Sequence, residues 1–367
     1  MSKTNGYEVK PGCTLLTMRG IEELSAKVSY YLETWKTLDL IDSVGIDCPR
    51  FSSGEAKGIV CQSVRGKDLF VLIDPFNYSI TYRMNGIVNH MSPDDHFQDL
   101  KRILSAVGGK AKRITVIMPM LYEGRQHRRQ SRESLDCAHA LQELSAMGVS
   151  NIVTFDAHDS RVQNAVPLLG FDDMSPRYQM LKAFVKVYGK DFFTNNKIIF
   201  ITPDEGAFAR ANSYSSSLGV DIGMFFKKRN LERVVEGENP ISMHFFIGHD
   251  VEGKSAFVVD DILSVGTSVL KVFHSLHDMH ADKIFGFITF GLFSEGPEAF
   301  DEAYAKGVFD KIFVTNLIYI PDSIKSKPWI HVVDMSKYVA YVISAIHDNH
   351  SISDIIDPDE KIELLLQ

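Results

Sequence analysis

The stretch from Ser255 to Leu270, SAFVVDDILSVGTSVL, constrains the fold of this chain more than any other. Its apolar run, Ala256–Val259, is typical of a strand buried on both faces, and it ends on two carboxylates, Asp260 and Asp261. A turn of small residues, Ser264–Ser268, follows, after which apolar residues recur at helical spacing. The unpaired N–H groups that begin such a helix favour a phosphate, and the acids suit ribose hydroxyls or Mg²⁺. A solvated acid pair before a capped helix would give the same pattern, so both interpretations stay open.

Strands and helices alternate along most of the chain. Apolar runs predict strands at Thr14–Thr17, Leu69–Ile73, Ile114–Met118, Ile152–Phe155, Ile198–Ile201, Ala256–Val259, Lys283–Ile288 and Ile312–Asn316. Helical patterns lie between most of them, which predicts an α/β protein with mostly parallel sheets flanked by helices. With 367 residues, of which 45% are hydrophobic, the chain is long enough for two cores. Pro176 interrupts a polar stretch, and we expect a domain boundary beside it.

Composition argues against several functions. The net charge of −8 does not suit a nucleic-acid or anionic-membrane surface, so a phosphate ligand must meet locally concentrated Arg and Lys. The sequence has no run of about 18 apolar residues and no signal-peptide pattern at its N-terminus, so we expect no membrane association and a cytoplasmic location. The four cysteines lack metal-site spacing, and we expect neither disulfides nor structural zinc.

Two polar segments each follow a predicted strand in the first half. The first, GRQHRRQSRES, places four arginines between Arg125 and Arg132, and guanidinium groups pair bidentately with polyphosphate oxygens. The second, Asp156–Asp159, places His158 among carboxylates at a strand end, where it could bind a metal or a phosphate. Taken alone, each also fits a plainer interpretation: a solvated basic loop, and a His that hydrogen-bonds a nearby carboxylate.

Two basic segments in the second half have different interpretations. MFFKKRN releases Lys227, Lys228 and Arg229 from a strand end into a long polar segment, and such a cationic loop could close over negative charge that develops during phosphoryl transfer. Gly248–Ser255, GHDVEGKS, satisfies the P-loop pattern, but a strand rather than a helix follows it. We therefore interpret it as a chance match and expect Lys254 not to bind nucleotide.

These segments resemble, in collinear order over roughly Thr14 to Ile356, the ribose-phosphate pyrophosphokinases, which make phosphoribosyl pyrophosphate. FSSGEAKGIVCQSVRGKD resembles the family's RFSDGE…ESVRGKD, GRQHRRQS resembles ARQDRKDKS, and DAH resembles DLH. ITPDEGAFARA resembles VSPDAGGVARA, KKR lies where the family has KRR, and VVDDILSVGTS resembles the ribose-5-phosphate loop of the type I phosphoribosyltransferase fold. The resemblance implies two tandem phosphoribosyltransferase-like domains, 1–176 and 177–337, with the active site at their junction. It also implies a C-terminal segment, 338–367, whose helix packs back on the first domain.

The resemblance further implies roles for individual residues. The positions that match the family's ATP-binding residues are Glu55, Arg125, Gln126 and His158. Those that match its ribose-5-phosphate-binding residues are Asp204, Asp260, Asp261, Ser264, Val265, Gly266, Thr267 and Ser268. His158 and Asp204 would hold the cofactor Mg²⁺, and Lys227 and Arg229 would stabilise the transition state as the ribose 1-hydroxyl attacks the β-phosphorus of ATP and AMP leaves. The family's enzymes form dimers and hexamers, so a homo-oligomer is implied.

Two other classes stay open. Ser53, Glu205, Ala207 and Val265 depart from the family pattern, which favours a non-catalytic regulatory homologue that binds nucleotide or sugar phosphate. Glu205 and Ala207 place a charge and a methyl group beside a backbone that would approach phosphate. The second class is a phosphoribosyltransferase proper, which joins a base to ribose phosphate. It is disfavoured because such enzymes usually have one phosphoribosyltransferase-like domain and because the ATP-binding segment at Arg125–Gln126 would then have no purpose. The segments that add to the family's usual length are Trp35–Asp47, Asn77–His90 and Asn230–His249.

Overall fold

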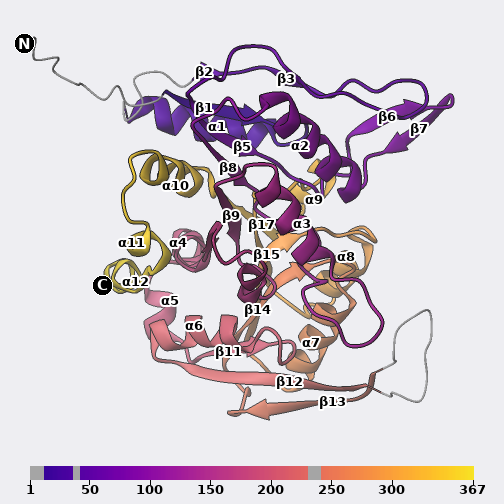
Figure 1. Ribbon diagram of the computed structural model, residues 1–367. Helices are drawn as coiled ribbons and strands as arrows, with labels where there is room; N and C mark the ends of the chain where they lie inside the picture. Colours follow the sequence, from indigo (N-terminus) through magenta and orange to yellow (C-terminus); the bar gives the residue numbers. More distant parts are fainter. Residues whose placement is uncertain (1–11, 36–41, 230–240) are drawn as a thin grey trace, which may run out of the picture. The chain divides into compact units, whose positions relative to one another are not determined.

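The computed structural model describes residues 12–35, 42–229 and 241–367, which form two compact units (Figure 1). Unit 1 extends to Met174 and takes in Ser336–Ile356, and unit 2 comprises Ser175–Met335 and Asp357–Gln367. The chain therefore passes between the units close to residues 176 and 337, where the domains were expected to divide. The resemblance implied that the segment 338–367 packs on the first domain; its residues up to Ile356 belong to unit 1, and Asp357–Gln367 belong to unit 2.

Unit 1 is built on a six-stranded parallel sheet in the order β10-β9-β8-β5-β1-β2. Its strands are β1 (Cys13–Thr17), β2 (Asp42–Ser43), β5 (Asp68–Leu72), β8 (Arg113–Ile117), β9 (Asn151–Phe155) and β10 (Gly170–Met174). Its helices are α1 (Glu22–Thr34), α2 (Pro93–Val107), α3 (Asp136–Ala146), the 3₁₀ helix η1 (Ser160–Ala165), α10 (Ser336–His347) and α11 (Ser353–Ile356). Two small antiparallel pairs complete the unit: β3 (Ile46–Asp47) with β4 (Ile59–Val60), and β6 (Thr81–Met84) with β7 (Ile87–His90).

Helix α2 illustrates how the sequence sets the ends of an element. Ser92 Oγ accepts a hydrogen bond from Asp95 N, and the Asp95 carboxylate accepts one from Ser92 N, which forms a capping box. Pro93 occupies the first turn, and Gly108 ends the helix with a left-handed φ of 58°. The apolar face of α2 packs into the core of unit 1. Its residues are all buried: Phe97, Leu100, Ile103, Leu104 and Val107.

Unit 2 is built on a seven-stranded sheet in the order β13-β12-β11-β14-β15-β16-β17, parallel except for β13. Its strands are β11 (Ile198–Thr202), β12 (Asp221–Arg229), β13 (Ile241–Gly248), β14 (Ser255–Leu263), β15 (Lys283–Gly291), β16 (Lys311–Thr315) and β17 (Ile330–Val333). Its helices are α4 (Arg177–Tyr188), α5 (Asp191–Asn195), α6 (Phe208–Leu218), α7 (Thr267–Asp278), α8 (Glu298–Ala305), α9 (Asp322–Lys325) and α12 (Asp359–Leu366).

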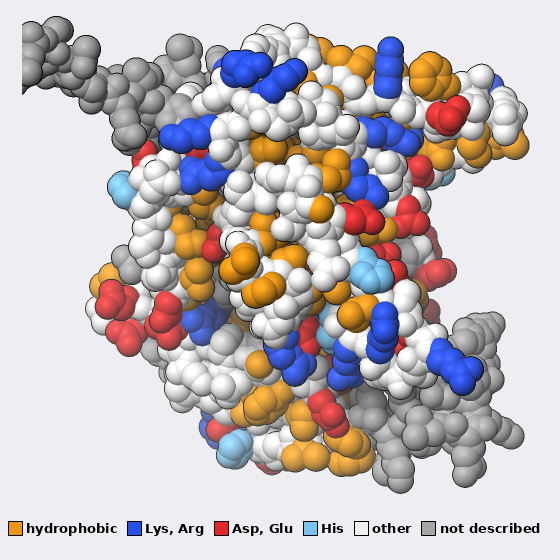
Figure 2. Space-filling view, in the orientation of Figure 1, with side chains coloured by type: hydrophobic (Ala, Val, Ile, Leu, Met, Phe, Trp, Pro, Cys, Tyr) orange, Lys and Arg blue, Asp and Glu red, His pale blue; other side chains and the backbone are white. Residues whose placement is uncertain are grey.

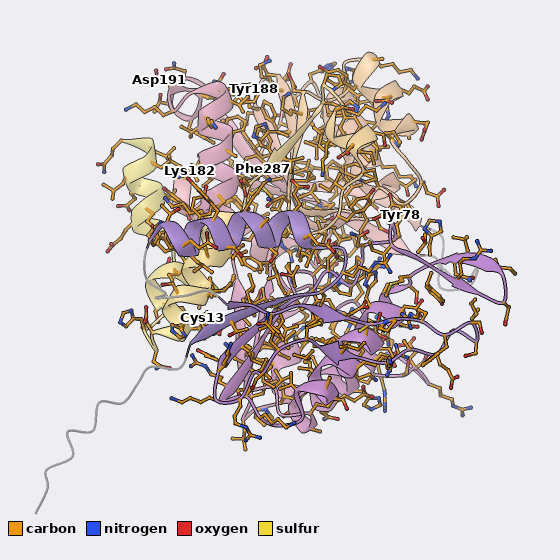
Figure 3. The ribbon with its side chains drawn as sticks, turned by 90° about the horizontal axis from the view of Figure 1, so that it is seen from above. Cys13, Tyr78, Lys182, Tyr188, Asp191 and Phe287 are labelled. Atoms are coloured by element: carbon orange, nitrogen blue, oxygen red, sulfur yellow. The ribbon has the colours of Figure 1, made fainter. Side chains whose placement is uncertain are left out.

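Aromatic side chains fill the core between α4 and the sheet of unit 2. The ring centroid of Phe184 lies 5.0 Å from that of Phe257 and 5.1 Å from that of Phe285, both edge to face. Phe257 and Phe287 lie 5.1 Å apart in the same arrangement, and Tyr188 extends the cluster along α4 (Figure 3). These contacts hold β14, the strand expected to carry the ribose-binding acids, rigidly in the sheet.

Helix α12 is attached to unit 2 by charged and polar contacts. Asp359 Oδ1 forms an ion pair with Arg177 Nη2 at 2.8 Å and accepts a hydrogen bond from Ser217 Oγ at 2.7 Å. Figure 2 shows acidic side chains gathered over this end of the chain, where Asp359 and Glu360 form the first turn of α12. The negative charge suits the positive end of a helix dipole.

The fold class expected from the sequence is confirmed, and the predicted strands are present with small shifts of their ends. Several strands are longer than expected, and two of them extend through expected site residues. β14 continues through Asp260 and Asp261 to Leu263, and β12 continues to Arg229, whereas the sequence predicted that a loop begins near Lys227. All four cysteines are free thiols, and none of the described helices is long and apolar enough to span a membrane.

Candidate active site

The carboxyl ends of β11 and β14 form a topological switch point in unit 2. The two strands pair in parallel, yet the chain leaves β11 through α6 toward β12 and leaves β14 through α7 toward β15 on the other side. In open α/β sheets, the crevice at such a reversal is where ligands bind. Asp204 follows β11, and Asp260 and Asp261 lie near the end of β14, so the structure brings three expected residues to this edge.

The three acids have different environments. Asp204 Oδ1 accepts hydrogen bonds from Gly206 N at 3.1 Å and Ala207 N at 3.4 Å, which fixes the turn before α6. Asp261 is buried, and its backbone N–H donates to Asp260 Oδ1 at 3.0 Å. Burial, and then the charge of Asp261, raise the pKa of Asp260 well above its ordinary value. A cation bound at this edge would therefore favour the form in which both carboxyls are charged.

Arg210 is a residue that the sequence analysis missed. Its Nη1 lies 3.5 Å from Asp261 Oδ1, and its side chain is largely buried. The guanidinium lowers the pKa of Asp260 and so opposes the effect of Asp261. One signal was available: Arg210 lies in the first turn of α6, where the helix dipole disfavours a cation unless an acid compensates it.

The turn between β14 and α7 has the geometry of a phosphate site. It consists of Ser264–Gly266, and α7 begins at Thr267 without a side-chain cap, so its first N–H groups point beyond the helix. Gly266 has a left-handed φ of 90°, and a Cβ at this position would lie 2.3 Å from Phe300 Cζ, so only glycine fits. Thr267 and Ser268 are exposed, as is Val265, which is 44% exposed.

The departures at Glu205 and Ala207 leave the neighbouring turn undistorted. Ala207 has a φ of −86°, which any L-residue adopts, and it is only 2% exposed, so its methyl group is accommodated by the core. Glu205 is exposed. The backbone of this turn therefore does not require the glycine that the family has at position 207.

Lys227 and Arg229 lie on the strand next to this edge. Met224 on β12 is opposite Thr202 at the end of β11, so Lys227 and Arg229 lie beyond the carboxyl end of β11. β12 pairs there with β13, with Lys227 opposite His244 and a shift of register between Lys228 and Arg229. The expectation that Lys227 and Arg229 lie in a loop is wrong, because the antiparallel pairing with β13 extends β12 to Arg229. Residues 230–240 of the expected loop lie outside the described residues.

In unit 1, the structure brings together the two polar segments that follow β8 and β9. The rings of His127 and His158 lie 5.3 Å apart between centroids, and His127 Nε2 lies 3.4 Å from Asp159 Oδ2. Gln126 Nε2 donates to Ser134 O at 2.9 Å, which closes the segment that contains Arg128, Arg129 and Arg132. Arg125, Arg128, Arg129 and Arg132 are exposed. The edge formed by β8 and β9 thus combines imidazole, amide and guanidinium groups that suit a polyphosphate.

Glu55 belongs to a separate loop of unit 1, Phe51–Glu55, and is exposed. Phe51 N donates to Glu55 O at 2.7 Å, and Gly54 N donates to Phe51 O at 2.9 Å, so the loop is a closed turn. Ser53 Oγ donates to Glu55 Oε2 at 2.9 Å. The residue that departs from the family pattern therefore orients the expected ATP-binding carboxylate.

The switch point of unit 1, between β1 and β5, is filled by the protein itself. Asn77 Nδ2 donates to Gly20 O at 2.6 Å, and Asn77 O accepts a hydrogen bond from His96 Nε2 at 2.9 Å, which ties the turn after β1 to α2. A cavity of about 160 Å³ remains beside it. Two arginines line it, Arg19 and Arg50, and Arg50 is paired with Asp99 at 3.0 Å.

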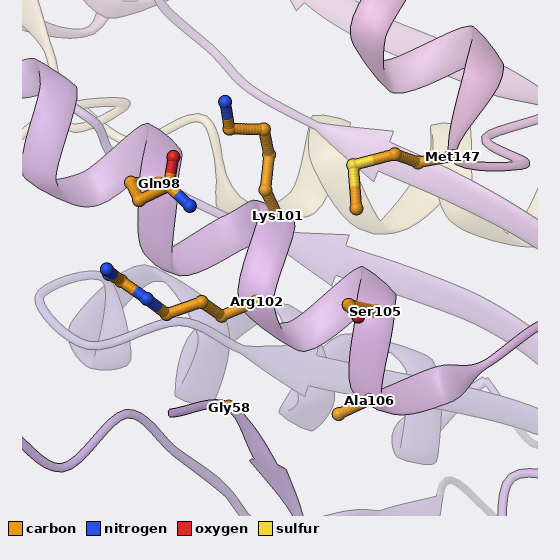
Figure 4. A pocket seen from close by; sticks show the side chains of 7 residues that line it. All are labelled: Gly58, Gln98, Lys101, Arg102, Ser105, Ala106 and Met147. Atoms are coloured by element: carbon orange, nitrogen blue, oxygen red, sulfur yellow. The ribbon is translucent and has the colours of Figure 1, made fainter. Parts of the chain in front are cut away.

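A shallow groove of about 470 Å³ lies between α2 and the end of α3 (Figure 4). Lys101 lines it and pairs with Glu143 at 2.8 Å, and Arg102 pairs with Asp99 at 2.6 Å. Gly58 also lines it, and the carbonyl of Arg102 lies close to that glycine because a Cβ would be only 2.4 Å from it. Both cations are compensated by acids of the same unit, and none of the expected site residues lies here.

The P-loop-like segment is a turn between two strands, as expected. β13 ends at Gly248 and β14 begins at Ser255, so no helix follows the Lys-Ser pair. Lys254 Nζ lies 2.6 Å from Asp221 Oδ2 and is thereby engaged at the opposite end of the sheet from Asp260.

The structure provides oxygen ligands suited to Mg²⁺ but no complete metal cage. Among the residues it describes, no three His, Cys, Asp or Glu side chains are grouped so that they could hold a metal ion by themselves. Asp204, Asp260 and Asp261 supply carboxylate oxygens, and Mg²⁺ commonly binds one or two carboxylates together with substrate phosphates and water. The residues present thus fit a Mg²⁺ ion that arrives with a phosphorylated substrate.

Two domain models of known proteins match the chain. Residues 13–148 match the N-terminal domain of ribose phosphate pyrophosphokinase, and residues 225–357 match the phosphoribosyl synthetase-associated domain. The ribose-phosphate pyrophosphokinase of Mycoplasma pneumoniae is 28% identical over 313 residues, which cover 83% of this chain and 85% of that protein. The ribose-phosphate pyrophosphokinase of Campylobacter jejuni is 28% identical over 344 residues, which cover 92% of this chain and 99% of that protein.

A solved structure has the same fold. The phosphoribosylpyrophosphate synthetase from Mycobacterium smegmatis superposes with a TM-score of 0.75 at 22% identity, over 92% of this chain and 99% of that chain. The two family matches lie in order and together span most of the sequence. The chain therefore belongs to the ribose-phosphate pyrophosphokinase family.

Proposed function

We propose that the chain is a ribose-phosphate diphosphokinase, which transfers the diphosphoryl group of ATP to the 1-hydroxyl of ribose 5-phosphate and releases AMP. The observation that supports this most is the switch point of unit 2, where an uncapped helix start, a glycine that tolerates no side chain and three carboxylates share one edge. Ribose 5-phosphate would bind at this edge, with its phosphate on the turn before α7 and its ribose hydroxyls on the carboxylates. The names of the curated relatives agree with this activity.

The residues of unit 2 would bind and orient ribose 5-phosphate. The N–H groups at the start of α7 and the hydroxyls of Ser264, Thr267 and Ser268 would hold the 5-phosphate, with Val265 and Gly266 contributing backbone. Asp260 and Asp261 would accept hydrogen bonds from the ribose hydroxyls, and Arg210 would hold the Asp261 carboxylate in place. Asp204 would approach the reacting end of the sugar.

The residues of unit 1 would bind ATP. Arg125 and Gln126 would contact the nucleotide, His158 would help to hold the Mg²⁺–triphosphate, and Glu55 would contact the base. His158 and Asp204 are the residues that would hold Mg²⁺, which when bound neutralises charge on the transferred phosphates.

The reaction needs positioning and charge stabilisation rather than a covalent enzyme intermediate. The ribose O1 forms a bond to the β-phosphorus while the bond from that phosphorus to the α-phosphate oxygen breaks, and AMP leaves. Lys227 and Arg229 would stabilise the negative charge that develops on the transferred group. The proposal also includes a cytoplasmic enzyme that forms a homo-oligomer.

The first test is the release of AMP from purified protein supplied with ATP, Mg²⁺ and ribose 5-phosphate, with each component omitted in turn. We expect AMP only when all three are present. Absence of AMP, combined with binding of ATP or ribose 5-phosphate in calorimetry, would instead support the regulatory homologue. Consumption of phosphoribosyl pyrophosphate with a purine or pyrimidine base would support a phosphoribosyltransferase.

Replacing Gly266 with alanine should impair ribose-5-phosphate binding specifically. The new Cβ would lie 2.3 Å from Phe300 Cζ, and the φ of 90° is strained for alanine, so the phosphate turn must shift. We expect the KM for ribose 5-phosphate to rise by about 10- to 100-fold, since a displacement of about 1 Å can have such an effect. Steady-state kinetics with saturating ATP measures this change.

Gly253→Ala is the matched control for Gly266→Ala. Gly253 also has a left-handed φ, of 66°, but a Cβ there meets no atom within 4 Å, and it lies in the turn before β14. We expect Gly253→Ala to lower stability slightly and to leave the KM for ribose 5-phosphate unchanged. Equal kinetic effects of the two substitutions would show that backbone strain alone, rather than the phosphate turn, determines the result.

A further inference from the structure

The inserted segment Asn77–His90 forms a hairpin whose position is fixed at its base. Asn85 and Gly86 have φ values of 51° and 80°, which is the two-residue turn that joins β6 to β7. Met91 N donates to Ile80 O at 2.8 Å, and this hydrogen bond closes the neck of the hairpin directly before α2. The hairpin extends from unit 1 as a separate two-stranded arm (Figure 1). An isolated pair of strands is marginally stable, so it needs further contacts.

One face of the hairpin supplies those contacts by supporting the loop Phe51–Glu55. Met84 Sδ would lie 2.5 Å from a Cβ at Gly54, so the loop backbone rests directly on this side chain. Asn85 N donates to Ser52 O at 3.0 Å, which joins the tip of the hairpin to the loop. The absence of a side chain at Gly54, with its φ of 95°, is what allows this close approach.

The residue that begins the loop is held by the same face. The Arg50 guanidinium lies over the Tyr82 ring, 4.8 Å from its centroid, and pairs with Asp99 at 3.0 Å. Arg50 is also bridged to Ala56, so both ends of the loop are joined. Tyr82 and Met84 are two residues apart on one strand and therefore lie on the same face.

We propose that the β6–β7 hairpin positions the loop Phe51–Glu55 for nucleotide binding, with Tyr82 and Met84 as its positioning residues. The proposal rests on the proposed function, because Glu55 is assigned to ATP there. The hairpin holds the loop at Arg50, Ser52 and Gly54, and Ser53 in turn orients the Glu55 carboxylate. Binding is tighter when the loop is already ordered, because less conformational entropy is lost on association.

The test removes the hairpin without opening its base. Residues 81–90 are replaced by a Gly-Ser link, since Ile80 and Met91 are already hydrogen-bonded to each other. We expect the KM for ATP to rise at least about tenfold, with the KM for ribose 5-phosphate and kcat changed by less than about twofold. The double substitution Tyr82→Leu and Met84→Ala should also raise the KM for ATP. The single substitution Tyr82→Phe should leave that KM close to the wild-type value because it keeps the ring.

Val88→Ser is the matched control on the hairpin. Val88 is 55% exposed and pairs with Arg83, so it lies on the face opposite to Tyr82 and Met84. We expect this variant to have the wild-type KM for ATP. An unchanged KM for ATP in the hairpin deletion, or an equal loss in Val88→Ser, would overturn the positioning role.

Hydrogen exchange separates failure of this inference from failure of the proposed function. The amides of Phe51 and Gly54 are hydrogen-bonded within the loop, and we expect both to exchange faster in the deletion variant than in the wild type. If the wild type forms no AMP, the diphosphokinase proposal fails, and this measurement together with ATP calorimetry still tests the hairpin. If exchange and ATP affinity are both unchanged, the hairpin does not position the loop.

Discussion

Lys227→Ala should lower kcat by about 10³-fold while leaving the affinity for ATP nearly unchanged. The reason is that a fixed cation contributes most where charge develops in the transition state, and a group that acts only there affects kcat rather than ground-state binding. Lys227 lies on β12, next to the switch point formed by β11 and β14. Steady-state kinetics and ATP calorimetry on the same preparation measure the two quantities.

Lys228→Ala is the matched control for Lys227→Ala. It removes the same charge from the adjacent position of β12, to which the family pattern assigns no transition-state contact. We expect a change in kcat of less than about fivefold, since the general electrostatic effect of removing one charge is small. A normal rate for Lys227→Ala would remove this part of β12 from the mechanism, and equal losses in both variants would indicate a nonspecific effect of charge.

The strand that carries Lys227 shows where sequence-based prediction reached its limit. The apolar run before Lys227 predicted a strand, and the basic residues after it predicted a loop. The structure extends β12 to Arg229 because β13 pairs with it from the edge of the sheet. The partner strand β13 begins only at Ile241, after residues 230–240, so no local pattern in the sequence predicts the pairing.

The phosphate turn was predictable, because its determinants are adjacent in sequence. A buried strand, two acids, a glycine and a helix start at Ser255–Leu270 identify it, and Gly266 has the backbone conformation that such a turn requires. The partners of these residues were not predictable in the same way. Arg210 reaches Asp261 from α6, and Phe300 sets the space beside Gly266 from α8, and both contacts exist only once the sheet has brought its connections together.

The hairpin shows the same limit for an insertion. Its extra length was visible in the sequence, and the Asn85-Gly86 pair is typical of a tight turn. Its contacts with the loop Phe51–Glu55 depend on the fold of unit 1, since the two segments are separated by β4 and β5. Insertions of this kind can be recognised from the sequence, but their effect on a site has to be read from the structure.

A buried charge cluster joins helix α10 to the sheet of unit 1. Asp68, which is 1% exposed, accepts hydrogen bonds from Arg113 Nε at 2.8 Å and from Arg113 Nη2. His347 Nδ1 on α10 lies 2.9 Å from Asp68 Oδ2, and Arg113 also donates to Ile346 O and Asn349 Oδ1, each at 2.8 Å. Because Asp68 and His347 are 279 positions apart, no local pattern in the sequence indicates this contact.

Asp68→Asn should lower the free energy of unfolding of unit 1 by about 3 kcal/mol, at the lower end of the range for a broken buried ion pair because Arg113 is partly exposed. The substitution leaves Arg113 without its carboxylate and weakens the attachment of α10. Urea unfolding gives the size of the effect. Hydrogen exchange of β5, β8 and α10 assigns it to unit 1, since two units do not have to unfold in one step.

The control and the pH dependence distinguish the cluster from a general charge effect. Lys27→Ala breaks an exposed ion pair with Glu23 on α1 and should lower the free energy of unfolding by about 0.5 kcal/mol or less.

Burial raises the pKa of Asp68, but the hydrogen bonds from Arg113 and His347 outweigh this effect and hold that pKa below its ordinary value. The stabilisation is therefore complete above the unfolded-state pKa of about 3.9 and is lost as the pH falls through the folded-state pKa. We expect the difference between wild type and Asp68→Asn to be constant near neutral pH and to shrink below about pH 4; a difference that does not depend on pH would show that the charge of Asp68 is not its source.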